Sequence, residues 1–170
     1  MFLIKAPLNI QDYYKIIFEK SSFGLNNDAL VKIDKSFDFL SKVYSKNIIY
    51  GINTGFGPMA QYKIKDKDHI QLQYNLIRSH ASGTGKIISP MYVRASILAR
   101  LNSFMLGYSG VHKSVIKLMI KLMNNNITPI IYEHGGVGAS GDLVQLAHLA
   151  LVLIGVDLQV GHTFILNSCM

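Results

Sequence analysis

The chain has 170 residues, a length that predicts one domain with room for a buried hydrophobic core. Hydrophobic residues make up 49% of the chain and charged residues 16%, which excludes a disordered tail, and the single cysteine excludes a disulfide scaffold. The net charge is +7, but the basic residues are dispersed along the chain, so we expect no nucleic-acid partner. Nucleic-acid binding is a distant alternative, which a strongly salt-dependent affinity for DNA would support.

Helical periodicity dominates the chain, and glycine-rich loops interrupt it. Asn9 is followed three residues later by Asp12, a pattern that predicts a capped helix start. Ser89 and Pro90 predict another, with the serine as cap and the proline at the first helical position. The expected elements in chain order are a helix over 11–19, a turn over 21–27, a helix over 28–47, a short strand or extended segment over 48–50, and helices over 66–80, 90–106, 111–123 and 142–154.

Three glycine-rich loops, at 51–62, 81–89 and 133–141, are more than connections require. Loops held by rigid helices often carry binding and catalytic residues. The third loop leads into a helix, as phosphate-binding loops do, but it lacks the spacing and the surrounding strands of a nucleotide site. A serine-hydrolase turn also fails, because Ser140 stands one residue too close to the following glycine.

Three sequence blocks then match one family in order: YGINTGFG at 50–57, LQYNLIRSHASGTG at 72–85 and GGVGASGDLVQLAHLAL at 135–151. Over residues 8–155 the chain resembles the histidine, phenylalanine and tyrosine ammonia-lyases. The resemblance implies a mainly α fold, namely the N-terminal, cofactor-bearing region of an all-helical lyase with glycine-rich active-site loops and minor β structure. It divides the chain into a partial lyase domain, 1–155, and a divergent tail, 156–170.

The resemblance also implies a cofactor made from the chain itself. Ala139, Ser140 and Gly141 would cyclise autocatalytically to a methylidene-imidazolone (MIO), an electrophile, with no external cofactor. The nitrogen of Gly141 would attack the Ala139 carbonyl carbon, and two waters would leave. Asp142 is expected to cap the helix that follows. The histidines show no metal-binding spacing, so we expect no metal.

Three further residues, one alone and two as a pair, match functional residues of the family. Tyr50 matches the base that removes the β-proton of the substrate, and Ser79 with His80 matches the pair that reads the substrate side chain. This pair resembles histidine-type lyases, which implies deamination of L-histidine to urocanate. The neighbouring residues also resemble tyrosine lyases, so conversion of L-tyrosine to coumarate is the alternative. For His148, on an apolar helix face, a core histidine is the favoured interpretation.

The chain departs from the family in length. Family members are far longer, form homotetramers and build each active site from three subunits, and several of their site residues have no positions here. The change of pattern after Gly155 suggests a truncated reading frame, a decayed gene or a fragment, and a catalytically inactive remnant is therefore a second functional class. We expect no ammonia release from residues 1–170 alone. The apolar run at 143–156 is too short for a membrane span, which favours a cytoplasmic protein.

Overall fold

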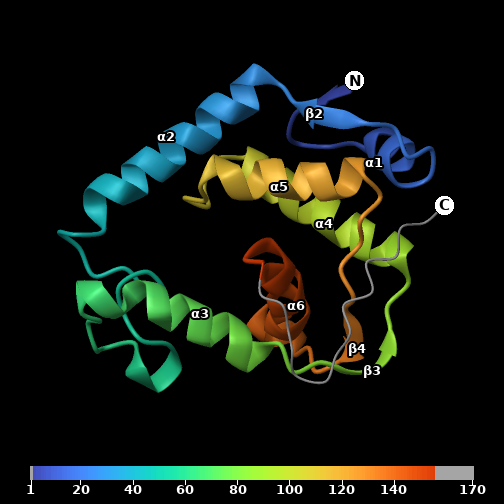
Figure 1. The fold of residues 1–170 in the computed structure, drawn as a ribbon. Helices are drawn as coiled ribbons and strands as arrows, with labels where there is room; N and C mark the ends of the chain where they lie inside the picture. The colour runs from blue at the N-terminus through green and yellow to red at the C-terminus, as the bar shows by residue number, and fades with distance from the viewer. Residues whose placement is uncertain (1, 156–170) are drawn as a thin grey trace.

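A computed structural model describes residues 2–155, and it confirms the mainly α class (Figure 1). Strands are short and occur only as two pairs within the described residues. In chain order the elements are β1 (Phe2–Ile4), α1 (Ile10–Ile17), β2 (Phe23–Leu25), α2 (Asn27–Val43), the 3-10 helices η1 (Gly57–Met59) and η2 (Asp66–Asp68), α3 (His69–His80), β3 (Thr84–Ile87), α4 (Pro90–Met105), α5 (Lys113–Asn124), β4 (Tyr132–His134), the 3-10 helix η3 (Gly138–Ser140) and α6 (Leu143–Leu153). The expected tail at 156–170 lies outside the described residues.

The helix starts follow from local chemistry. Asn9 and Asp12 form the expected capping box, each side chain accepting a hydrogen bond from the other residue's backbone N–H. Pro90 is the first residue of α4, as expected, but the Ser89 side chain makes no capping hydrogen bond. The helix expected over 28–47 begins at Asn27 and ends at Val43.

The strands differ from the expectation. Residues 23–25, expected within a turn, form β2 and pair in parallel with β1, because Phe23 and Ile4 are buried together in the core. Residues 48–50 do not form a strand, since the Ile49 amide bonds to the Asn53 side chain instead of to a partner strand. Residues 84–87, expected in a loop, form β3, which pairs antiparallel with β4.

The hydrophobic core lies where α4 and α5 meet α1, α2 and the β1–β2 pair (Figure 1). Ile97, Leu98 and Leu101 of α4 are completely buried there. Arg94 is also buried, and its guanidinium donates to the carbonyls of Met123 (3.0 Å) and Ile16 (3.3 Å). These bonds join α4 to the ends of α5 and α1, so the charged side chain ties three core elements together.

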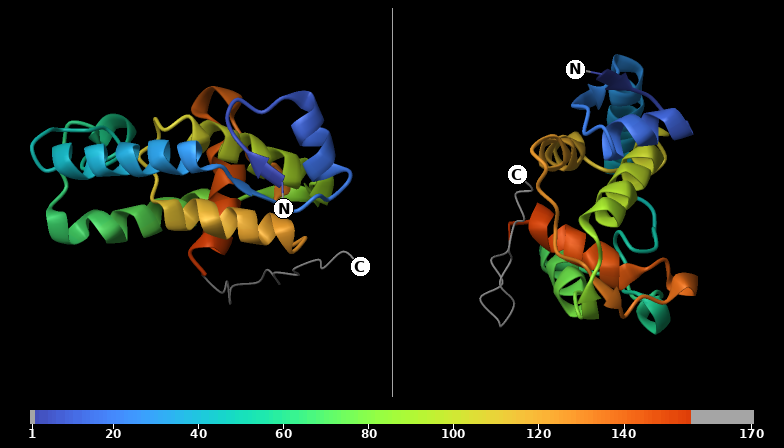
Figure 2. Two further views of the ribbon diagram at one scale, coloured as in Figure 1. Left: turned by 90° about the horizontal axis from the view of Figure 1, so that it is seen from above. Right: turned by 90° about the vertical axis from the view of Figure 1, so that its right-hand side faces the viewer.

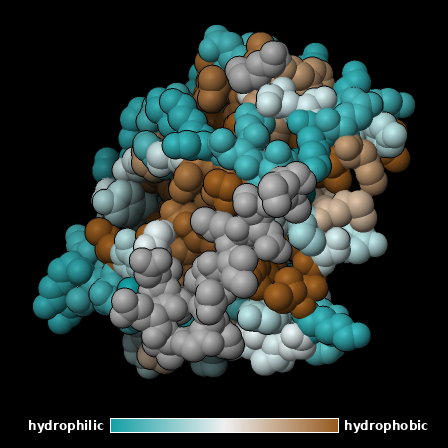
Figure 3. Space-filling view, turned by 45° about the vertical axis from the view of Figure 1, so that its right-hand side comes forward, coloured by the Kyte–Doolittle hydropathy of each residue, from teal (hydrophilic) through white to brown (hydrophobic). Residues whose placement is uncertain are grey.

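Helices α3 and α6 pack against each other below this core and position the glycine-rich loops (Figure 1). The first and third loops project on the same side of the molecule (Figure 2). Hydrophobic residues also reach the surface, across the middle of the face in Figure 3. Within the described part of the chain, no helix combines the length and the apolar character that a membrane crossing needs.

Candidate active site

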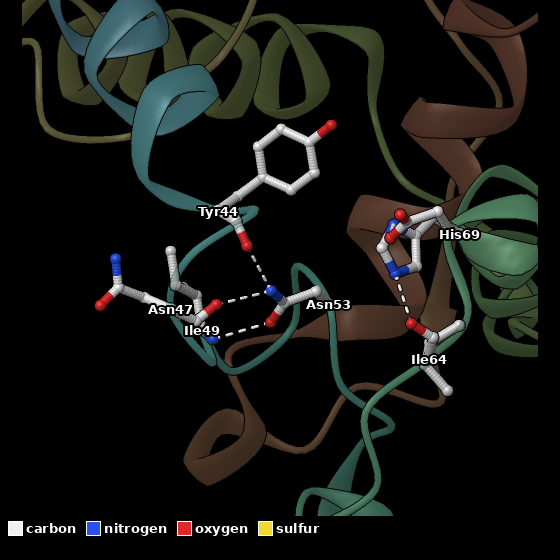
Figure 4. A network of polar contacts seen from close by, with 7 residues as sticks. Tyr44, Asn47, Ile49, Asn53, Ile64 and His69 are labelled. Carbon is white, nitrogen blue, oxygen red and sulfur yellow. Dashed lines mark hydrogen bonds and ion pairs between the residues drawn. The ribbon is translucent and has the colours of Figure 1, made fainter.

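The first loop is organised by one buried amide, the side chain of Asn53 (Figure 4). Its Oδ1 accepts from the Ile49 amide at 2.8 Å, and its Nδ2 donates to the carbonyls of Tyr44 at 2.6 Å and Asn47 at 2.7 Å. Asn53 is 1% exposed, so these three bonds replace water for its amide group. The amide therefore fixes the chain on both sides of Tyr50. The sequence alone did not predict this role, although the position of Asn53 between Gly51 and Gly55 in a matched loop is an available signal.

Tyr50 itself lies at the surface and is 64% exposed. Its phenolic oxygen accepts a hydrogen bond from the Gly57 amide at 3.2 Å, and its ring meets that of Phe56 edge to face at 6.1 Å. The Gln73 side chain donates to the Gly51 carbonyl at 3.3 Å, which links this loop to α3. Tyr50 is thus oriented by its own loop while its ring stays accessible.

Ser79 and His80 occupy the last turn of α3. The Nδ1 atom of His80 lies 2.9 Å from the Leu76 carbonyl and 3.1 Å from the Ser79 hydroxyl. In the tautomer with the proton on Nδ1, this atom donates to the carbonyl, which can only accept. The Ser79 hydroxyl donates to the same carbonyl at 3.0 Å. His80 also borders a cavity of about 170 Å3 between α3 and α6, with the apolar lining residues Leu76, Ile77, Leu143, Leu146, Ala147 and Ala150.

The Ala139–Gly141 tripeptide forms an exposed, tight turn. The Ser140 amide and hydroxyl both donate to the Val137 carbonyl at 2.7 Å, and the Gly141 amide donates to the Gly138 carbonyl at 3.2 Å. Gly141 has the left-handed φ of +83°, and open space surrounds the position where a Cβ would lie. This conformation favours glycine, as the proposed role of Gly141 requires.

Asp142 stands at the N-cap position of α6, as expected, and its carbonyl accepts from the Leu146 amide at 3.2 Å, but the expected side-chain cap is absent. The side chain makes no capping hydrogen bond. Its backbone is left-handed, with φ 54° and ψ 44°, whereas residues whose side chains cap a helix typically have an extended backbone.

A cleft of about 520 Å3 opens beside this turn, between α4 and the start of α6. Gly141, Asp142 and Gln145 line one side, and Arg100 with Tyr92 lines the other. The Gln145 Oε1 atom is buried and has no hydrogen-bond partner among the described residues. A hydrogen-bond acceptor and a cation thus lie near the tripeptide.

The structure brings the second and third loops together. The β3–β4 pair aligns Thr84 with His134, and a buried histidine of α6, His148, accepts a hydrogen bond from the Gly83 amide at 3.0 Å. The hydroxyl of Tyr50 accepts its hydrogen bond within its own loop, from Gly57, and within residues 2–155 no hydrogen bond links Tyr50 to residues 139–141. No cluster of three or more potential metal ligands occurs within residues 2–155.

Comparison with known proteins identifies the family. A family model for aromatic amino acid lyases matches residues 8–163, and so reaches into the segment 156–170. A probable histidine ammonia-lyase of Thermoplasma acidophilum is 38% identical over 149 residues, which are 87% of this chain and 30% of that protein. A histidine ammonia-lyase of Halalkalibacterium halodurans is 40% identical over 149 residues, covering 87% and 29%.

Solved structures agree with this match. The fold is similar to that of tyrosine aminomutase from Streptomyces globisporus, with a TM-score of 0.80 and 32% identity over 87% of this chain and 28% of that one. For histidine ammonia-lyase from Trypanosoma cruzi the TM-score is 0.76 and the identity 31%, over 89% and 30%. The chain spans about 30% of the length of the curated relatives above. By its motifs, its fold and these matches, the chain belongs to the aromatic amino acid lyase family.

Proposed function

We propose that this chain provides part of an ammonia-lyase site that deaminates L-histidine to urocanate without oxidation, by way of an MIO electrophile made from Ala139, Ser140 and Gly141. The observation that carries the proposal is the turn at these residues. It combines an alanine, a serine and a left-handed glycine in an exposed loop directly before a helix.

The residues present fit this group. Its formation removes the Ala139 carbonyl oxygen together with the amide hydrogens of Ser140 and Gly141 as one water, and the Ser140 hydroxyl with its α-hydrogen as the other. The hydrogen bonds that must be given up are those to the carbonyls of Val137 and Gly138. All lie in an exposed loop, where water can replace them, so their loss costs little. The open space at Gly141 leaves room for the change.

When formed, the group supplies an electrophile that captures the substrate and makes the amine a better leaving group. Tyr50 would then remove the β-proton, as a base whose oxygen is held by the Gly57 amide. His80 would face the substrate side chain. Its Nδ1–H is held by Leu76, so in the neutral ring Nε2 is the atom that can accept a hydrogen bond from the substrate.

The names of the two curated relatives favour histidine as the substrate. Tyrosine is the second candidate, because the same Nε2 can accept from a phenol and because a tyrosine aminomutase shares the fold.

The proposal includes a homotetramer in the cytoplasm, with each site shared between subunits. Two observations support shared sites: Tyr50 is not hydrogen-bonded to the tripeptide of its own chain, and large apolar side chains lie at the surface. Examples are Ile48 at 71% and Tyr108 at 89% exposure.

A hybrid enzyme tests the proposal. Residues 1–155 are joined in register to the segment of the Halalkalibacterium halodurans relative that follows its matched region, and kcat/KM is measured for L-histidine and L-tyrosine. We expect a preference for histidine, no turnover in Ser140→Ala, and a loss of about a hundredfold or more in Tyr50→Phe. A preference for tyrosine would make L-tyrosine the substrate in place of L-histidine. Full activity of Ser140→Ala would overturn the mechanism.

A further inference from the structure

The chain contains a second Ala-Ser-Gly sequence, Ala81–Gly83, directly after the Ser79–His80 pair. By residue type it offers the same carbonyl, hydroxyl and amide as the tripeptide at 139–141. The two differ in backbone: Ser140 lies in a 3-10 helix before a left-handed glycine, whereas Ala81–Gly83 connects the end of α3 to β3. The contacts that hold this second tripeptide therefore bear on whether it can cyclise.

The amide of Gly83 is engaged by a buried side chain from another element. It donates to Nε2 of His148, in α6, at 3.0 Å, and His148 is 6% exposed. A backbone N–H can only donate, so Nε2 bears no proton and the neutral ring has its proton on Nδ1. The ring also meets the ring of Tyr132 edge to face at 5.5 Å. The acceptor is therefore fixed in place by its surroundings.

Glycine is required at position 83 for this contact. A Cβ there would lie 2.8 Å from His148 Nε2 and 3.2 Å from the Cβ of Tyr132. The neighbouring amide is held as well, since Ser82 donates to the His80 carbonyl at 2.8 Å around Ala81, which has φ −79° and ψ 58°. These angles are those of an inverse γ-turn. The turn and the tether together determine how the chain leaves His80.

The two tripeptides thus differ in what binds their glycine amide. Gly141 donates to an exposed carbonyl of its own loop at 3.2 Å, and solvent can replace that bond. Gly83 donates to a buried imidazole 65 residues away along the chain, so its acceptor is supplied by α6 and not by its own loop.

We propose that His148 is a positioning residue: its neutral imidazole tethers Gly83 to α6, which holds the Ser79–His80 end of α3 in place and leaves Ala81–Gly83 uncyclised. The importance of Ser79 and His80 rests on the proposed function, but the tether does not. The interpretation of His148 as a core histidine is correct for its burial and incomplete for its role.

Amide hydrogen exchange in the 170-residue chain tests the tether. In His148→Leu, which removes the acceptor, the Gly83 amide should exchange at least about tenfold faster, since a half-buried donor loses its partner. His148→Gln places an oxygen at the same distance along the side chain and should restore exchange to within about threefold of the wild type. His134 is an exposed histidine on β4, so His134→Gln is the matched control and should leave the exchange of the Gly83 amide unchanged.

Two further readouts distinguish positioning from simple packing. The 15N spectrum of His148 should show the tautomer with a protonated Nδ1, and the peptide containing residues 81–83 should keep its full mass in the wild type. Unchanged Gly83 exchange in His148→Leu, a protonated Nε2, or water loss at 81–83 would each overturn the inference. If the peptide containing residues 139–141 keeps its full mass while the Gly83 amide stays protected from exchange, the proposed function is wrong but the tether stands.

Discussion

Replacing Asn53 with alanine should release the loop that carries Tyr50. The substitution removes three buried hydrogen bonds of 2.6, 2.7 and 2.8 Å, to Tyr44, Asn47 and Ile49. At about 0.5–1.5 kcal/mol net for each bond, the free energy that holds the loop closed should fall by about 2–4 kcal/mol. Because 1.4 kcal/mol is a factor of ten, the loop should open roughly 30 to 700 times more often.

The assay is hydrogen exchange at the Ile49 amide, which donates to Asn53 and reports opening of this loop directly. The amide of Ile97, in the core helix α4, serves as the internal reference. Asn75→Ala is the matched control, because the amide of this exposed asparagine accepts only from the Gln71 side chain. Exchange at Ile49 within twofold of the wild type in Asn53→Ala would refute the reasoning that the Asn53 side chain holds the loop.

Three other substitutions test the core and the turn. Arg94→Met leaves two buried carbonyls without their charged donor, so the free energy of unfolding measured in urea should fall by about 2–4 kcal/mol. Arg100 is half-buried, and Arg100→Met should change that free energy little; equal losses in the two variants would contradict the role of Arg94. Burial raises the pKa of Tyr13 above its ordinary value of 10.0, so its contribution to stability is present below about pH 10 and is lost as the pH rises through the raised pKa. The thermal unfolding temperature of Tyr13→Phe should therefore fall less steeply at alkaline pH than that of the wild type. The same pH dependence in both proteins would contradict a stabilising role of the neutral Tyr13 side chain. Gly141→Ala places a side chain on a left-handed residue, so the peptide that contains residues 139–141 should keep its full mass because the turn no longer dehydrates. Dehydration as in the wild type would mean that the turn does not need glycine.

Local patterns predicted the helices because their determinants are close in sequence. The capping box at Asn9 and Asp12 and the proline at position 90 act within one turn, and the structure places both as expected. The strands were not predictable in this way. Each of β1, β2 and β4 has three residues, and β2 exists because Phe23 is drawn into a core formed with distant segments.

The candidate site divides along the same line. The motifs predicted Tyr50, Ser79, His80 and the tripeptide at 139–141 as site residues, but not the residues that hold them in place. The buried roles of Asn53 and His148 depend on partners that only the folded chain brings near, such as Gly83, which is 65 residues from His148. The side-chain cap predicted at Asp142 is absent, because aspartate is a residue type that favours capping but the backbone there is left-handed.

Formation of the electrophile from Ala139, Ser140 and Gly141 can be measured as a change in peptide mass. The folded hybrid enzyme is digested, and the peptide that contains these residues is weighed and fragmented. We expect a mass lower by two waters, with the loss confined to Ala139–Gly141 and absent in Ser140→Ala. A full-mass peptide from a hybrid that is folded and deaminates histidine would contradict it.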